Sequence, residues 1–93
     1  MDNREAAAVL RGHLDGYRRS AYRELVALRG KPQNTELRGA SGTSYQVEVE
    51  VHWDSEPGGA VRVLGSIDDG GLRSLSPISQ DFILAPDGTF VGE

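Results

Sequence analysis

Three side chains that can bind a metal ion or move a proton alternate along one stretch of the chain: Glu50, His52 and Asp54. In a strand, every second side chain points to the same face, about 6.6 Å from the next. His52 is then a possible general base oriented by Glu50, and a strand returning after the turn at 56–59 would place Arg62 beside them. This arrangement allows a small ligand-binding or hydrolase-like protein, which we keep as the alternative function.

The same residues fit a solvated, cross-strand paired face better than an active site. Ligands spaced along one flat strand do not close a tetrahedral metal shell. No nucleophile or anion-binding turn is linked to His52 by spacing, and the glycine pairs at 58–59 and 70–71 lack the lysine or helix start of a phosphate loop. The absence of cysteine also excludes disulfides and thiolate ligands. We therefore expect no enzyme, no cofactor and no metal site.

Arginines recur every seven residues near the start of the chain, at Arg4, Arg11 and Arg18. Residues 1–31 carry seven basic and four acidic side chains, whereas residues 32–93 carry three basic and ten acidic ones. Asp15 can pair with Arg11 at helical spacing, which is the ordinary use of such charges on an exposed helix. Nucleic acid is therefore not the expected partner, although the basic stripe would suit phosphates.

A row of small residues runs along the same segment: Val9, Gly12, Gly16 and Ser20. Each glycine inside a helix costs roughly 1 kcal/mol relative to alanine, so their presence needs a reason. Small residues four apart allow another backbone to approach closely. The hypothesis is a contact ridge for a second helix, most simply its own copy in a homodimer. A bend, or simple tolerance of glycine, is the alternative explanation.

A second candidate interaction surface lies on the outer face of the predicted sheet. The Asp69-Gly70 dipeptide predicts a hairpin that places Leu64 opposite Leu75 on the polar side of the sheet. Two apolar residues on this face make a small patch. Together with the polar residues around them they define the candidate surface: Glu50, His52, Arg62, Leu64 and Leu75.

The elements that position these residues follow from two periodicities. Apolar residues recur at three- and four-residue steps from Ala6 to Leu28, which predicts one helix over about 3–29. Asp2 or Asn3 caps its start, and Gly30 with Pro32 ends it.

After Pro32 the period changes to two, most clearly at 45–53, where every odd residue is apolar and every even residue is polar. The predicted strands span about 35–40, 44–54, 60–68, 72–76, 81–85 and 89–92. With Trp53 opposite Val61, the register pairs His52 with Arg62, Glu50 with Leu64 and Glu48 with Ser66.

The chain should therefore form a single α+β domain over residues 1–93. Its expected fold is one long N-terminal amphipathic helix packed on one face of a four- or five-stranded antiparallel β-meander. No stretch has the roughly 20 apolar residues that span a bilayer, and no secretory signal is visible, so a cytoplasmic location is the default expectation. The expected function is a small non-enzymatic interaction module that binds a protein partner or itself.

Overall fold

The first helix, α1 (Asn3–Arg18), begins where predicted. The carboxylate of Asp2 accepts a hydrogen bond of 3.1 Å from the backbone N–H of Glu5, which satisfies one of the free donors at the helix start. The apolar stripe of α1 buries Ala6, Leu10 and Leu14. The face of α1 that is buried is thus the one that the spacing of its apolar residues predicts.

The predicted single helix over 3–29 is wrong in its length, because the helix is interrupted after Arg18. The N–H of Arg19 turns back to the carbonyl of Gly16, and Ala21 is extended, with φ −70° and ψ 153°. The Glu24 carboxylate accepts a hydrogen bond of 2.7 Å from the Ala21 N–H, so a new helix begins there. This second helix, α2, spans Tyr22–Ala27.

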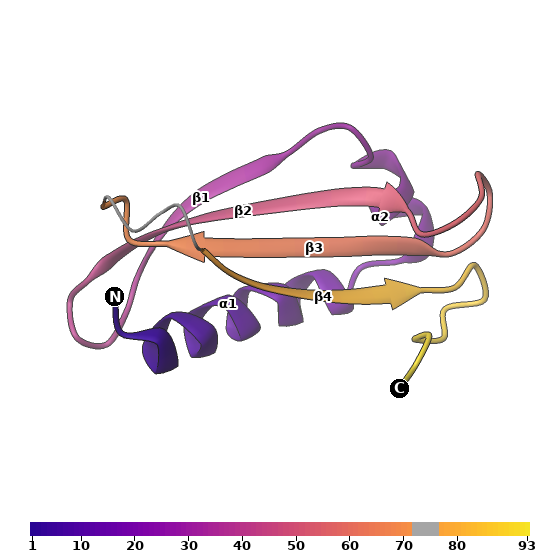
Figure 1. Ribbon diagram of the computed structural model, residues 1–93. Helices are drawn as coiled ribbons and strands as arrows, with labels where there is room; N and C mark the ends of the chain where they lie inside the picture. Colours follow the sequence, from indigo (N-terminus) through magenta and orange to yellow (C-terminus); the bar gives the residue numbers. More distant parts are fainter. Residues whose placement is uncertain (72–76) are drawn as a thin grey trace.

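The computed structural model describes residues 1–71 and 77–93, and the strand predicted at 72–76 lies outside them. In the described part, four antiparallel strands form one sheet in the order β1-β2-β3-β4 (Figure 1). The strands are β1 (Gln33–Arg38), β2 (Ser44–Trp53), β3 (Val61–Asp68) and β4 (Ile78–Leu84). The predicted α+β architecture, helix on antiparallel sheet, is confirmed.

The register between β2 and β3 is the predicted one. Trp53 lies opposite Val61, His52 opposite Arg62, and Glu50 opposite Leu64. On the other side of β3, Leu64 faces Asp81 of β4. The position opposite Leu64 that the sequence assigned to Leu75 is thus taken by β4, and Leu75 itself lies outside the described residues.

The predicted strand at 89–92 is reduced to a single bridge. Phe90 pairs with Leu84, and the N–H of Val91 donates to the carbonyl of Ile83 at 2.9 Å. Gly88, with φ 88°, makes the tight turn that brings these residues back. The segment 85–93 therefore folds against the end of β4 without extending the sheet by a full strand.

The hydrophobic core lies between the sheet and the two helices. Alternate residues of β2 and β3 are buried, as half-buried strands require. Helix α1 packs against β3 and β4, and the shorter α2 packs against β2 and β3. At Gly65, an added Cβ would lie 2.9 Å from Leu10 Cδ1 and 3.0 Å from Leu14 Cδ2. The absence of a side chain there lets α1 lie close to β3.

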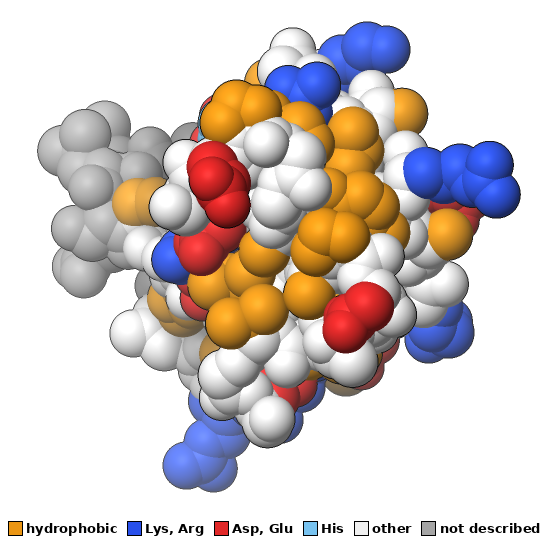
Figure 2. Space-filling model, turned by 90° about the vertical axis from the view of Figure 1, so that its right-hand side faces the viewer, with side chains coloured by type: hydrophobic (Ala, Val, Ile, Leu, Met, Phe, Trp, Pro, Cys, Tyr) orange, Lys and Arg blue, Asp and Glu red, His pale blue; other side chains and the backbone are white. Residues whose placement is uncertain are grey.

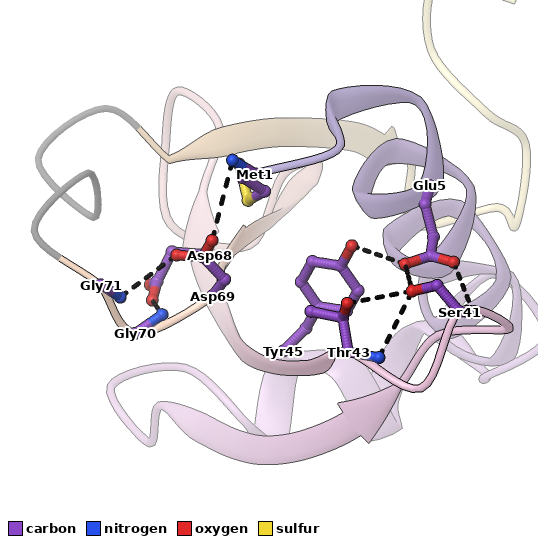
Figure 3. A network of polar contacts seen from close by, with 9 residues as sticks. All are labelled: Met1, Glu5, Ser41, Thr43, Tyr45, Asp68, Asp69, Gly70 and Gly71. Atoms are coloured by element: carbon purple, nitrogen blue, oxygen red, sulfur yellow. Dashed lines mark hydrogen bonds and ion pairs between the residues drawn. The ribbon is translucent and has the colours of Figure 1, made fainter.

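Polar contacts fix the rotation of α1 beneath the sheet. On one flank, the side-chain amide of Gln80 in β4 donates a hydrogen bond of 3.0 Å to the Ala7 carbonyl. On the other flank, the Glu5 carboxylate accepts hydrogen bonds from Ser41, in the β1–β2 turn, and from the hydroxyl of Tyr45 (Figure 3). Each flank of α1 therefore faces a different edge of the sheet.

Candidate interaction surfaces

The outer face of the sheet brings together the polar residues that the sequence singled out. His52 Nε2 lies 3.7 Å from a carboxylate oxygen of its strand neighbour Glu50. Both side chains are exposed, with 54% of the His52 side chain and 37% of the Glu50 side chain accessible to solvent. A pair this exposed gains little from its mutual attraction, because water screens it.

Arg62 is the most connected side chain on this face. Its guanidinium donates to the carboxylate of Asp54, with distances of 3.2 and 2.9 Å, and also to that of Asp81 on β4. These acceptors raise the pKa of Arg62, the hydrogen bond to Asp54 being the main cause. Asp54 is thus held by Arg62 and does not approach the pair of Glu50 and His52.

No group of three or more His, Asp or Glu side chains in residues 1–71 and 77–93 has the geometry to hold a metal ion. The remaining member of the outer surface, Leu64, is half-buried between Glu50 and Asp81 in neighbouring strands. Its apolar surface is therefore bordered by carboxylates.

A polar hollow that the sequence did not single out lies near the other end of this face. Its volume is about 200 Å³. The side chains that line it come from three strands: Asn34, Gln46, Glu48, Ser66 and Asp68. The predicted register already placed Glu48 opposite Ser66. The part that Asn34 of β1 plays in this hollow could not be predicted, because the alternation of apolar and polar residues does not define the order of the strands.

The row of small residues that the sequence singled out is here called the glycine ridge. Val9, Gly12 and Gly16 lie on α1, but Ser20, which was predicted on the same helix, lies beyond its end at Arg18. Gly12 and Gly16 are exposed, and neither has a positive φ. A Cβ at Gly12 would meet nothing within 4 Å, and one at Gly16 would meet only the end of the Arg19 side chain, at 3.9 Å. No close contact within the described chain therefore requires glycine at either position.

A hollow of about 250 Å³ adjoins the glycine ridge and is lined by His13, Gly16, Tyr17 and Ser20. The rings of His13 and Tyr17 meet edge to face, with centroids 5.5 Å apart. His13 Nε2 is buried and has no hydrogen-bond partner within the described residues. Leaving a buried polar atom unpaired is unfavourable, so this nitrogen would gain from a polar group brought by another molecule.

A third cavity, of about 300 Å³, lies between α1 and β4 and is here called the Arg18 cavity. The side chains that characterise it are Arg11, Asp15, Arg18, Asp81, Phe82 and Glu93. The Arg18 guanidinium donates two hydrogen bonds, of 2.9 and 2.8 Å, to the carboxylate of Glu93. This ion pair lowers the pKa of Glu93. In the sequence, Arg18 stands out only as one of the arginines of the basic stripe.

Hydrophobic side chains gather at the end of the molecule that carries α2, the β2–β3 turn and the segment after β4 (Figure 2). The partly buried side chains here are Tyr22 of α2, Trp53 at the end of β2 and Phe90 after β4, together with Val91, whose exposed fraction is 46%. The Tyr22 hydroxyl donates a hydrogen bond of 2.6 Å to the Gly59 carbonyl, which ties α2 to the β2–β3 turn. Much of this apolar surface is therefore used to close the end of the core.

Comparison with protein-family models, with curated proteins and with solved structures gives no match to this chain. Among the described residues, neither helix is long and apolar enough to cross a lipid bilayer. The geometry of the surfaces is thus the basis for any functional assignment.

Proposed function

We propose that the chain is a small non-enzymatic interaction module that associates with a second copy of itself through the glycine ridge of α1. The observation that carries the proposal is the openness of Gly12 and Gly16. Two glycines inside one helix cost it roughly 1 kcal/mol each, and the packing around them offers no compensating contact within the described chain. An interface with another molecule supplies the missing reason.

The position of the ridge supports a contact with a second helix. Val9, Gly12 and Gly16 follow Glu5 by four, seven and eleven residues, so they share its flank of the helix. That flank is the one that faces the β1–β2 turn through Ser41. Two copies of α1 that cross at the glycines would bring their backbones close and gain extensive van der Waals contact.

The surroundings of the ridge offer further surface for such an interface. The hollow at His13 and Tyr17 provides a place for a partner side chain, and His13 Nε2 provides a polar atom without a partner in the described chain. Thr35 of β1 pairs with Val47 and so lies on the core side of the sheet, yet it is exposed. This part of the inner face is available for the second copy to cover.

Sedimentation equilibrium over a wide concentration range tests the proposal. The native chain should form a dimer, and Gly16→Leu should raise the dimer dissociation constant by at least about tenfold, equivalent to about 1.4 kcal/mol. Ala27→Leu is the matched control, because Ala27 is an exposed residue of α2 away from the ridge. A chain that stays monomeric at millimolar concentration would overturn the proposal.

A third variant, Leu64→Asp, tests whether the dimer interface lies on the outer face of the sheet instead of on the glycine ridge. If the ridge forms the interface, this substitution leaves the dimer dissociation constant unchanged. If Leu64→Asp abolishes association while Gly16→Leu does not, the interface lies on the outer face of the sheet and the assignment to the ridge is wrong.

A further inference from the structure

The Arg18 cavity contains a guanidinium that is already arranged to bind a carboxylate. The Cζ atom of Arg18 lies 4.8 Å from the centre of the Phe82 ring and 4.9 Å from that of the Phe90 ring. Two aromatic rings at this distance attract the cation and restrict its side chain. The planar guanidinium group of Arg18 is therefore held in place, with its two terminal nitrogens directed at one acceptor group.

The acceptor in this structure is the carboxylate of Glu93, from the segment that folds back after β4. Both Glu93 oxygens are used, one for each terminal nitrogen of Arg18, which is the two-point geometry that guanidinium and carboxylate groups prefer. The pair is not sealed from water, since 32% of the Arg18 side chain and 45% of the Glu93 side chain are exposed. A carboxylate from solution can thus compete for the same donors.

A second cation borders the same cavity. Arg11 lies two turns before Arg18 on α1 and is exposed, and it has no ion pair within residues 1–71 and 77–93. A molecule with two carboxylates could therefore place one on Arg18 and direct the other toward Arg11. The cavity volume of about 300 Å³ is at the small end of the range for small-molecule sites.

We propose that the Arg18 cavity binds a small dicarboxylate, one carboxylate replacing that of Glu93 on Arg18 and the other interacting with Arg11. Glu93 is then an intramolecular competitor that occupies the site when the ligand is absent. This proposal is independent of the self-association of α1, because Arg11 and Arg18 lie on the flank of the helix that faces β4 and not on the glycine ridge.

Two further carboxylates border the cavity and oppose an anionic ligand. Asp81 is neutralised in part by Arg62 on the outer face of the sheet. Asp15 forms no ion pair within the described residues, although its charge raises the pKa of Arg18 after the larger contribution of Glu93. Asp15→Asn should therefore tighten dicarboxylate binding. The proposal thus predicts a variant with higher affinity as well as variants that lose binding.

The competition with Glu93 has a measurable consequence. If Glu93 occupies Arg18 about nine-tenths of the time, only a tenth of the molecules are open to the ligand, and the apparent dissociation constant is about tenfold higher than the intrinsic one. Glu93→Gln keeps the size of the side chain but removes its charge. This variant should therefore bind the dicarboxylate several-fold more tightly than the native chain.

The test is an NMR titration with glutarate at constant ionic strength, followed through the Arg18 side-chain Nε–H signal and the backbone amides of Phe82 and Phe90. Butyrate, with one carboxylate, is the control ligand. We expect saturable shifts with glutarate, weaker binding of butyrate, and tighter glutarate binding by Glu93→Gln. In Arg11→Gln the preference for glutarate over butyrate should disappear.

Arg18→Lys and Arg23→Gln serve as the negative and matched controls. Lysine keeps the charge but loses the two-point fork, so Arg18→Lys should lose saturable binding. Arg23 is exposed on α2, and its loss should change nothing. Titration curves of the native chain that remain linear, or that are the same in Arg18→Lys, would overturn the proposal. If Glu93→Gln tightens glutarate binding no more than Asp15→Asn does, Glu93 acts only through its negative charge and is not a competitor for Arg18.

Discussion

The hydroxyl of Tyr45 donates a hydrogen bond of 2.7 Å to the carboxylate of Glu5, which joins the buried side of β2 to the first turn of α1 (Figure 3). The same carboxylate accepts hydrogen bonds from the N–H and the hydroxyl of Ser41, at 2.9 and 2.7 Å. Gly39 leaves room for this cluster, since a Cβ there would lie 2.6 Å from Glu5 Cδ. The start of α1 is thus fixed to the β1–β2 hairpin by one acidic side chain.

The first prediction concerns the ionisation of Tyr45. The hydrogen bond to Glu5, and burial in second place, raise the pKa of Tyr45 to about 12. This folded-state pKa is above the ordinary value of 10.0, so protonated Tyr45 stabilises the folded state. Its contribution to stability is complete below pH 10 and is lost as the pH rises from 10 toward 12. Burial also raises the pKa of Tyr17, so a spectrophotometric titration at 295 nm should show tyrosine ionisation that extends above pH 10, and Tyr45→Phe should remove its last step. A native titration in which all tyrosines ionise together near pH 10 would contradict the assignment.

The second prediction concerns acid stability. The hydroxyl of Ser41, then Tyr45 and the Ser41 N–H, lower the pKa of Glu5 from its ordinary value of 4.5. Around this pH the folded state therefore binds fewer protons than the unfolded state. The contribution of ionised Glu5 to stability is complete above pH 4.5 and is lost as the pH falls through the lower pKa that Glu5 has in the folded state. Urea unfolding between pH 7 and pH 3 should show a smaller pH dependence in Glu5→Gln than in the native chain. Equal slopes in both would show that Glu5 is not the responsible group.

The sheet was the part of the fold most open to prediction from sequence. Apolar and polar residues alternate at 45–53, so only one face of β2 can be buried. Pairing Trp53 with Val61 then fixes the cross-strand neighbours of Glu50 and His52. The helix break was not predicted, because Ser20 and Ala21 fit the helical period as well as their neighbours do. The break depends on the Glu24 side chain, which caps the Ala21 N–H and begins a new helix.

The candidate sites were only partly accessible to sequence reasoning. Val9, Gly12 and Gly16 of the glycine ridge lie within one helix, so spacing alone brings them together, whereas Ser20 lies beyond the helix end that the sequence did not predict. Arg18 and Glu93 are 75 residues apart, and no local pattern indicates that the segment after β4 returns to α1. Contacts of this kind depend on where the chain turns, here at Gly88, and become visible only when the strand order is known.

The third prediction concerns the ion pairs of the outer sheet face. Arg62 contacts Asp54 and Asp81, and these side chains are exposed to solvent, so their attraction should respond to salt. Arg62→Met should lower the midpoint of thermal unfolding at low salt, and this difference from the native chain should shrink at about 1 M NaCl, where the screening length falls to about 3 Å. Arg23→Met removes an exposed arginine with no ion pair in the described chain and should show no such salt effect. A deficit in Arg62→Met that persists at high salt would indicate lost packing of the arginine stem instead.

The last prediction compares two glycines in opposite environments. Gly65 lies beneath Leu10 and Leu14, which are both buried, so a methyl group at 65 must displace the leucine side chains or the helix. Overpacking of this kind typically costs about 1–3 kcal/mol, and Gly65→Ala should lower the free energy of unfolding by about that amount. Gly12→Ala adds the same methyl group in open space and should raise the free energy of unfolding by up to roughly 1 kcal/mol through helix propensity alone.

Both variants should be unfolded with urea at a protein concentration low enough to keep the chain monomeric, because association would add a concentration-dependent term. The slope of the unfolding free energy against urea should stay unchanged, so that the midpoints report stability directly. If Gly65→Ala is as stable as the native chain, α1 does not rest on β3 at this position. If Gly12→Ala is destabilised in the monomer, the glycine serves the fold of the single chain, and its openness no longer supports a role in self-association.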